Sequence, residues 1–223
     1  KLCKPFAKSI CTTFPECAKL LAPKGVQTGT PLRAQIFSGN RARGLKLAGF
    51  DGGKPVLMMI GGSLGAQSVN AVLRAALPEL TKKFDVLHVC GKGNLDETLQ
   101  SRTDYKQFEY VSDGLNDLFA AADFVVSRAG SNSISEFLAL KKPSLLIPLS
   151  ARASRGDQIL NAASFEKQGF ARVLDEDEMT AETMKKEIFA LYENKDKYVA
   201  AMEKSPAGDG VAAVMTQIKA LMR

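Results

Sequence analysis

An apolar run that ends in a glycine-rich turn constrains the fold more than any other part of the chain. Val56–Ile60 has the composition of a buried strand, the loop 61–65 carries three glycines, and a helical pattern starts at Ala66. Glycines let a backbone approach a ligand closely, and the amides that open a helix attract anions. The loop fits neither the dinucleotide fingerprint nor the P-loop, because it lacks G-x-G-x-x-G and a following lysine. Two interpretations stay open: a diphosphate-binding loop of another kind, or an ordinary strand-to-helix turn.

The same alternation of strand and helix continues through most of the chain. The predicted strands are 9–13, 26–28, 56–60, 86–90, 108–111, 124–127, 144–147 and 171–174, and the predicted helices are 15–21, 41–48, 66–80, 95–99, 115–121, 133–140, 158–169 and three later stretches. This alternation predicts an α/β fold, with a Rossmann-like parallel sheet and helices on both faces. Ligands of such folds bind outside the carboxyl ends of the strands. The loops 61–65, 127–133 and 149–157 should therefore share one edge.

Composition describes an ordinary globular protein. Of the 223 residues, 45% are hydrophobic and 24% are charged, and no apolar run approaches the ~20 residues that span a bilayer. The net charge of +6 would suit anionic lipids or phosphorylated ligands, but a solvated basic surface is the favoured explanation. Nucleic acid is disfavoured, since Trp is absent and no basic segment is interleaved with aromatic residues. The four cysteines lack metal-ligand spacing, so we expect reduced thiols in a cytosolic protein.

A small polar loop precedes the predicted helix 133–140 and contains Ser131, Asn132, Ser133 and Glu136. Ser133 and Glu136 fit the S-x-x-E pattern of a capping box, in which each side chain binds an amide of the helix start. The functional alternative is that Glu136 accepts hydrogen bonds from the vicinal hydroxyls of a sugar, while the loop amides bind phosphate. The motif by itself favours the capping box.

Three further polar residues have a structural and a functional interpretation. Gln158 and Asn161 share one face near the start of the predicted helix 158–169, where amides would suit neutral hydroxyls. A polar helix start capped by Asp157 is the alternative. Arg33 by itself is typical of a surface arginine. His88, the only histidine, lies in the predicted strand 86–90, and no catalytic triad or metal-ligand cluster can be assembled.

Four motifs in one order resemble the MurG family, the peptidoglycan GlcNAc-transferases. They are Thr28-Gly-Thr-Pro-Leu-Arg33, Gly61-Gly-Ser-Leu-Gly-Ala66, Ser127-Arg-Ala-Gly-Ser-Asn-Ser-Ile-Ser-Glu136 and Ser154-Arg-Gly-Asp-Gln-Ile-Leu-Asn-Ala162. Together they are far more specific than any one of them. The family converts lipid I to lipid II on the cytoplasmic face of the bacterial cell membrane, in cell-wall synthesis.

The resemblance implies a GT-B glycosyltransferase, in which the C-terminal of two Rossmann-like lobes holds most of the nucleotide-sugar donor. It gives UDP-GlcNAc-binding roles to ten residues. These are Gly62 and Ser63 at the diphosphate, Arg33 at the nucleotide, Val111 at the uracil through its backbone, Ser131, Asn132 and Ser133 at phosphate and ribose, Glu136 at the ribose hydroxyls, and Gln158 and Asn161 at the GlcNAc hydroxyls. The family's reaction is an inverting displacement, in which helix-start amides and hydroxyls rather than a metal stabilise the leaving UDP, and no cofactor is expected.

The family's N-terminal lobe, with its acceptor loop and expected catalytic base, has no counterpart in this sequence. We expect residues 1–32 to be a remnant of that lobe with the linker, and residues 33–200 to form the UDP-sugar-binding domain. Residues 201–223 should form an amphipathic helix that packs on the N-terminal lobe or, in its absence, on residues 1–30 or a second copy. The chain by itself should bind UDP-GlcNAc but transfer little. Lipid I would bind through the missing lobe, with peripheral association to an anionic membrane.

Two alternatives to this function remain at the sequence level. One is a glycolipid synthase of the same superfamily, which attaches a hexose to diacylglycerol; Gln158 and Asn161 in their present context favour GlcNAc instead. The other is a non-catalytic module that binds a nucleotide sugar, which the missing lobe keeps open.

Overall fold

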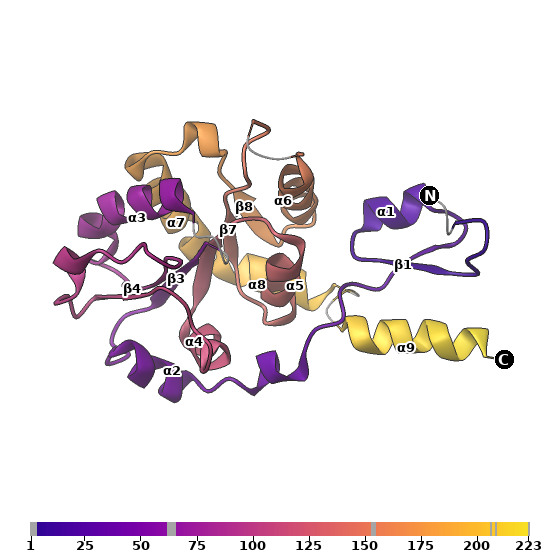
Figure 1. Ribbon diagram of the computed structural model, residues 1–223, viewed down its shortest axis with the longest axis horizontal. Coiled ribbons are helices and arrows are strands. Elements are labelled where there is room, and N and C mark those ends of the chain that lie inside the picture. Colours follow the sequence, from indigo (N-terminus) through magenta and orange to yellow (C-terminus); the bar gives the residue numbers. More distant parts are fainter. Residues whose placement is uncertain (1–3, 62–65, 153–154, 206, 208, 223) are drawn as a thin grey trace.

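A six-stranded parallel sheet forms the centre of the computed structural model, which describes residues 4–61, 66–152, 155–205, 207 and 209–222 (Figure 1). In spatial order the strands are β5 (Tyr105–Phe108), β4 (Asp85–Val89), β3 (Val56–Ile60), β6 (Phe124–Ser127), β7 (Ser144–Leu146) and β8 (Ala171–Val173). Every neighbouring pair is parallel. The chain builds outward from β3 to β5 and then returns to β6 on the other side of β3. Open α/β sheets bind ligands where the strand order reverses, so the edge beyond β3 and β6 is the expected binding edge.

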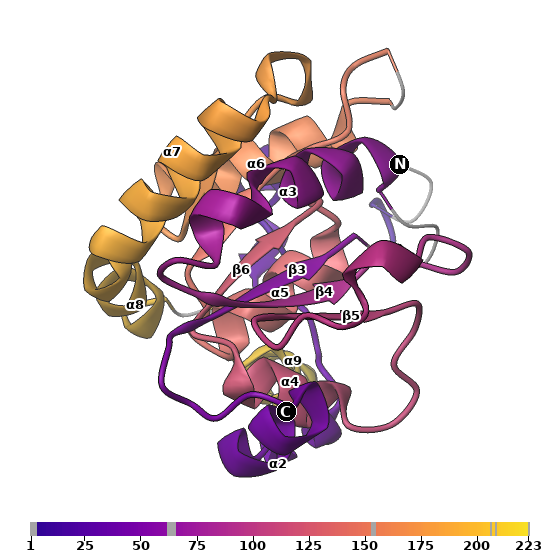
Figure 2. The same ribbon diagram turned by 90° about the vertical axis from the view of Figure 1, so that its left-hand side faces the viewer.

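Helices cover both faces of the sheet (Figure 2). On one face lie α3 (Gln67–Leu80) and α7 (Ala181–Glu193); on the other lie α2 (Arg41–Ala48), α4 (Leu115–Ala121), α5 (Ser131–Ala139), α6 (Asp157–Lys167) and α8 (Lys195–Glu203). Within β3, Val56 and Met58 pack into one layer while Leu57 and Met59 pack into the other. Both faces of the strand are buried, which explains its continuous apolar sequence. The predicted α/β fold is confirmed.

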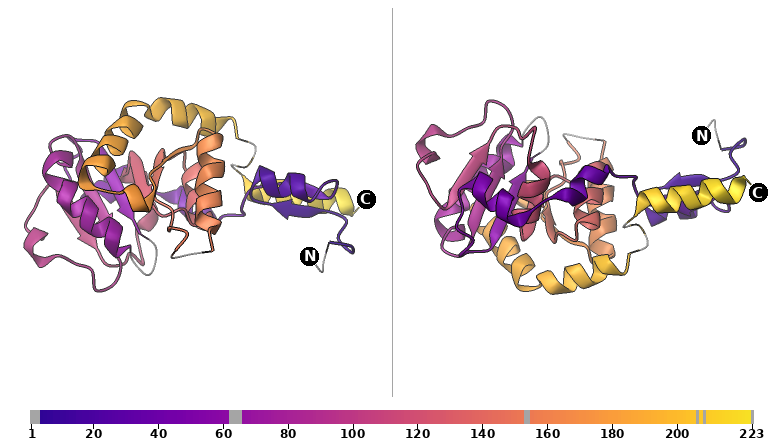
Figure 3. Two further views of the ribbon diagram at one scale, coloured as in Figure 1. Left: turned by 90° about the horizontal axis from the view of Figure 1, so that it is seen from above. Right: turned by 90° about the horizontal axis from the view of Figure 1, so that it is seen from below.

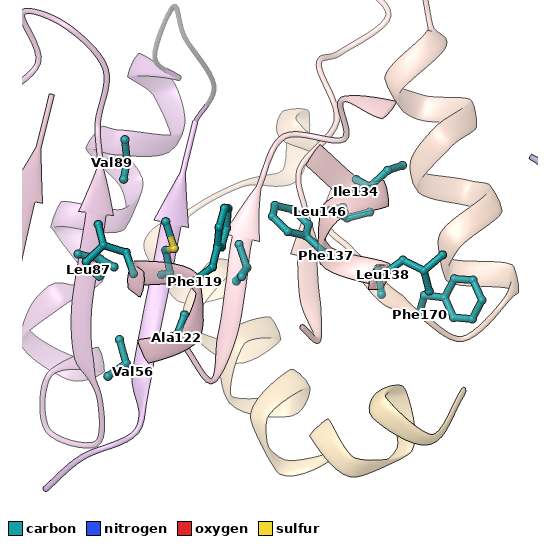
Figure 4. Packing of buried hydrophobic residues seen from close by; sticks show 14 of the residues in the cluster. Val56, Leu87, Val89, Phe119, Ala122, Ile134, Phe137, Leu138, Leu146 and Phe170 are labelled. Carbon is teal, nitrogen blue, oxygen red and sulfur yellow. The ribbon is translucent and has the colours of Figure 1, made fainter. Parts of the chain in front are cut away.

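The core beneath α4 and α5 fixes the helix that carries most of the polar loop residues (Figure 4). Phe119 of α4 and Phe137 of α5 meet edge to face, with ring centroids 6.0 Å apart. Ile134 and Leu146 are fully buried in the same cluster. Burial of each such side chain contributes roughly 1.5–3 kcal/mol, so α5 is held firmly against the sheet.

Residues 4–30 and α9 (Gly210–Leu221) form a small unit at one end of the molecule, where both chain ends lie (Figures 1 and 3). Besides α9 it contains β1 (Ile10–Thr12), α1 (Pro15–Leu20) and β2 (Gly25–Gln27), and β1 pairs with β2 in parallel. Ser9 Oγ donates a hydrogen bond to Gln217 Oε1 of α9 over 3.3 Å. The C-terminal helix thus lies against residues 4–30 rather than on the six-stranded sheet.

The chain crosses between the small unit and the sheet domain twice, and the two crossings pack on each other. A Cβ on Gly29 would lie 2.5 Å from the carbonyl oxygen of Ala207, and a Cβ on Gly210 would lie 2.4 Å from the carbonyl of Thr30. Gly29 also has φ +74°, a conformation that glycine adopts without steric cost. Both crossings therefore depend on glycine.

Three predicted elements need correction. The strand 108–111 is wrong: β5 lies three residues earlier, because its pairing with β4 sets its length, with Val86 opposite Tyr105 and Val89 opposite Phe108. Once β4 ends, residues 109–111 leave the sheet. The predicted helix 95–99 is only a 3₁₀ turn, η2 (Glu97–Leu99); two others are η1 (Ala34–Ser38) and η3 (Glu176–Glu178). The helix predicted at 133–140 begins two residues earlier, at Ser131.

Candidate functional site

A cavity of about 400 Å³ lies beside the carboxyl edge of the sheet. Its walls come from residues 33–38, from residues 110–119 and from Glu136 of α5. Arg33, Val111 and Glu136 thus meet around one space, although about 100 residues separate the first from the last. The volume is within the range of small-molecule sites in proteins.

Glu136 presents a carboxylate that is free to accept hydrogen bonds from a ligand. Its side chain is half-buried, and among the residues that the structure describes none donates a hydrogen bond to it. Burial raises the pKa of Glu136 above its usual value, while the positive charge of Arg33 opposes that rise. Burying a charged carboxylate without a hydrogen-bond donor is energetically unfavourable. A ligand whose hydroxyl groups donate to Glu136 would remove this penalty and therefore bind well.

Arg33 lies on the wall of the same cavity, in the segment 33–38 that precedes α2. It is the residue before η1, its side chain is exposed, and that side chain forms no hydrogen bond with any described residue. A guanidinium has five donors in a planar fork, so an uncommitted arginine beside a cavity is suited to phosphate. Val111 follows β5 and is half-buried at the cavity wall, beside the exposed ring of Tyr110.

The capping box predicted for Ser133 and Glu136 is wrong. The residue that caps α5 is Gly130, and none of the side chains that the structure describes caps this helix start. The first helical bond runs from the Ile134 amide to the Gly130 carbonyl, over 3.0 Å. Because the helix begins at Ser131, Glu136 lies in its second turn, too far along to reach the cap. The amides of Ser131, Asn132 and Ser133 precede the first helical bond and form the positive end of α5.

Gln158 and Asn161 do not line this cavity. The predicted cap Asp157 is instead the first residue of α6, and Gly156 caps the helix in a left-handed conformation. Gln158 Oε1 accepts a hydrogen bond from the Leu149 amide over 3.2 Å, and Asn161 Nδ2 donates to the Ala129 carbonyl over 3.0 Å. Both side chains therefore brace loops at the same edge of the sheet, next to the start of α5.

Two predicted site residues, Gly62 and Ser63, lie outside the described residues. Ser131, Asn132 and Ser133 lie in the first turn of α5, beside the cavity rather than on its wall. A second cavity, of about 410 Å³, lies in the small unit and holds none of the predicted residues; its walls are Lys4, Pro5, Ala22, Pro23 and Lys24.

Comparison with known proteins identifies the family. Residues 56–218, which make up most of the chain, match the glycosyltransferase family 28 C-terminal domain. The chain belongs to this family. Two curated relatives are the UDP-N-acetylglucosamine–N-acetylmuramyl-(pentapeptide) pyrophosphoryl-undecaprenol N-acetylglucosamine transferases of Clostridium botulinum (strain 657 / Type Ba4) and Geobacillus thermodenitrificans. They are 50% and 52% identical over 220 residues, 98% of this chain. The resemblance stated from the four motifs is confirmed. The chain spans 62% of the length of either relative.

Solved structures agree on the fold. MurG of Acinetobacter baumannii superposes with a TM-score of 0.68 at 21% identity, over 96% of this chain and 60% of that protein. The glycotransferase of kitacinnamycin gives 0.69 at 17% identity, over 95% and 55%. At such identities the likeness concerns the fold alone. The glycosyltransferase family 28 domain has the fold of the C-terminal lobe of GT-B enzymes, as the sequence predicted.

An ion pair at the carboxyl edge was missed by sequence reasoning. Arg128, directly after β6, pairs with Glu176 of η3 and also donates to the carbonyls of Ile147 and Pro148, over 3.2 and 3.4 Å. Glu176 accepts from Ser68 Oγ over 2.7 Å and from the Ser150 amide over 3.1 Å, and the bond from Arg128 holds its pKa below the usual value. The pair joins segments that follow β3, β6, β7 and β8. The only signal in the sequence is an arginine at the end of a buried strand.

His88 lies in the sheet, as predicted, and has a structural role there. It is fully buried in β4, with Nδ1 2.8 Å from Tyr105 Oη and Nε2 2.9 Å from Asn70 Oδ1. Burial lowers its pKa to about 3, so the ring is neutral at physiological pH. Asn70 Nδ2 donates to the Cys90 carbonyl, which leaves Asn70 Oδ1 to accept a hydrogen bond from His88 Nε2–H. Within the described ranges, no group of three or more His, Cys, Asp or Glu side chains is placed to hold a metal ion.

Proposed function

We propose that this chain is the donor-binding part of an inverting glycosyltransferase that transfers GlcNAc from UDP-GlcNAc to lipid I, forming lipid II. The observation that carries the proposal is the convergence of Arg33, Val111 and Glu136 on one cavity beside the carboxyl edge of the sheet. The names of relatives at about 50% identity support the substrate pair and disfavour a diacylglycerol acceptor.

The chemistry of each side chain supports a place along the donor. The Glu136 carboxylate can accept from both hydroxyls of a ribose, and the Val111 backbone can bond to the edge of the uracil. Arg33 and the positive end of α5, with Gly62 and Ser63, would stabilise the diphosphate and the charge that develops on the leaving UDP. Gln158 and Asn161 would bind the GlcNAc hydroxyls through the sides of their amides that do not brace the loops.

We further propose that the small unit belongs to the acceptor side of the parent enzyme. The relatives are longer than this chain by more than a third of their own length. Residues 1–32 would complete an N-terminal lobe and its linker, residues 33–200 would bind the donor, and residues 201–223 would pack on that lobe. The acceptor would bind on the additional lobe, and that lobe would also supply the catalytic base. The displacement itself would join the acceptor's muramyl hydroxyl to the anomeric carbon as UDP departs.

We also propose peripheral association with the cytoplasmic face of the bacterial membrane. Within the described part of the chain, no helix is both long and apolar enough to cross a bilayer. The support is the net charge of +6 together with large apolar side chains exposed on the small unit. Phe6, Leu20 and Met222 are 89%, 80% and 82% exposed. Co-sedimentation with anionic but not neutral vesicles is the expected result.

Calorimetry with nucleotide sugars tests the donor proposal. The folded chain should bind UDP-GlcNAc and UDP, and UDP-glucose more weakly, because Gln158 and Asn161 would contact the N-acetyl sugar. Absence of heat at millimolar ligand would refute the proposal, and preference for UDP-glucose would favour the glycolipid synthase. The isolated chain should turn over no lipid I; full turnover would contradict the division between donor and acceptor parts.

A further inference from the structure

A line of three hydroxyl groups connects the small unit to α5. Thr13 Oγ1 lies 3.1 Å from Thr30 Oγ1, and Thr30 Oγ1 lies 3.0 Å from Ser135 Oγ. Ser135 Oγ donates to the carbonyl of Ser131 over 2.8 Å. Each hydroxyl has one proton to donate. Since Ser135 uses its proton on Ser131, Thr30 must donate to Ser135 and Thr13 to Thr30. The line therefore has one direction, from the small unit into the first turn of α5.

The hydrogen bond between Thr30 and Ser135 connects the chain segments that carry Arg33 and Glu136, two residues of the cavity wall. Ser135 is 6% exposed and directly precedes Glu136 on α5. Thr30 lies three residues before Arg33, and Pro31 stiffens the segment between them. The Arg33 side chain forms no hydrogen bond with a described residue, so it does not hold itself in place.

We propose that Thr30 and Ser135 are positioning residues, whose hydrogen bond holds Arg33 across the cavity from Glu136. Neither hydroxyl is part of the cavity wall; both act through Arg33. Thr13 extends the same line, so the position of the small unit is transmitted to the cavity. The consequence for donor binding rests on the proposed function, but the geometry that the bond fixes does not.

The ionisation of Glu136 reports on the position of Arg33. Arg33 opposes the rise in the Glu136 pKa that burial causes; the other charged residue on the cavity wall is Asp113. If the bond between Thr30 and Ser135 is lost, Arg33 moves away and the pKa of Glu136 rises further. A bond that only stabilised the fold would leave this pKa unchanged in a folded variant.

Carboxyl-carbon NMR titration tests the proposal, with the Glu136 signal assigned from Glu136→Gln. Thr30→Val removes the hydroxyl without changing shape and should raise the Glu136 pKa toward its value in Arg33→Gln. Thr30→Ser keeps the hydroxyl and should titrate as the wild type. The matched control is Thr12→Val, which removes a neighbouring hydroxyl bonded to Phe14 and Val26 carbonyls.

Three results would overturn the proposal: no shift in Thr30→Val, an equal shift in Thr12→Val, or no shift in Arg33→Gln. Calorimetry then extends the test to the ligand. Thr30→Val should weaken UDP binding about fivefold, the usual effect of one hydrogen bond, and Thr30→Ser should not. In an Arg33→Gln background that loss should disappear, because both hydroxyls act through Arg33. If the wild-type chain binds no UDP, the proposed function fails, while the titration still decides what Thr30 does.

Discussion

At the residue scale, the charged form of Glu136 lowers the stability of the fold, and the same carboxylate is proposed to bind the ligand. Its pKa is raised in the folded chain, so the native state holds its proton more tightly than the unfolded state does. Stability therefore falls as pH rises through the window between the ordinary and the raised pKa. Glu136→Gln should leave the free energy of unfolding at pH 7 unchanged or higher. It should also weaken UDP binding about tenfold, because bonds to the charged group are lost. Urea unfolding and calorimetry measure the two effects; a destabilised variant would show that the carboxylate is a structural group.

His88 makes the stability depend on pH in the direction opposite to Glu136. Its pKa is about 3 in the folded chain and near 6.5 when unfolded, so the unfolded state takes up a proton first as pH falls. The free energy of unfolding should decrease below pH 6.5 by about 1.4 kcal/mol per pH unit. His88→Gln should show a flatter dependence between pH 6.5 and 5, above the range of ordinary carboxylates. Equal slopes in the two proteins, measured by urea unfolding, would show that His88 is not responsible.

At the scale of the elements, the Arg128–Glu176 pair should matter more than the surface pairs. The two side chains are 11% and 16% exposed, and the pair joins loops after four strands. Arg128→Met leaves a poorly hydrated carboxylate and should cost ~3 kcal/mol, whereas adding Glu176→Leu should restore much of that loss. Removal of the exposed Glu79–Lys82 pair is the matched control and should leave stability within error. Additive losses in the double variant, measured by denaturant unfolding, would contradict the coupling.

The elements themselves show where the sequence suffices. β3 and β6 are predicted to the residue because strands buried on both faces are continuously apolar. β5 is misplaced because its end is set by its partner β4, which local composition does not reveal. The start of α5 is misplaced because Gly130 caps it without a side-chain bond, while Ser133 and Glu136 imitate a capping box further along.

At the scale of the whole molecule, the cavity needs the tertiary structure. The sequence predicts that the loops after the strands share the carboxyl edge of the sheet, because the sheet is parallel. That Arg33, Val111 and Glu136 form one cavity wall depends on the path of residues 28–38 across the sheet domain, which no local pattern encodes. The motif resemblance grouped these residues only because the family already places them together.

The attachment of the small unit to the sheet domain gives the prediction at this scale. Gly29 and Gly49 both have φ +74°, but only at Gly29 would a Cβ meet backbone, 2.5 Å from the Ala207 carbonyl oxygen. Gly49→Ala should therefore cost only the ~1–2 kcal/mol of the left-handed conformation, within the sheet domain. Gly29→Ala should separate the two crossings as well. We expect amides of the small unit to lose protection in hydrogen exchange in Gly29→Ala, while the six-stranded sheet keeps its protection. An exchange pattern identical to that of Gly49→Ala would show that the small unit is held elsewhere, through contacts such as that of Glu16 with Ser164.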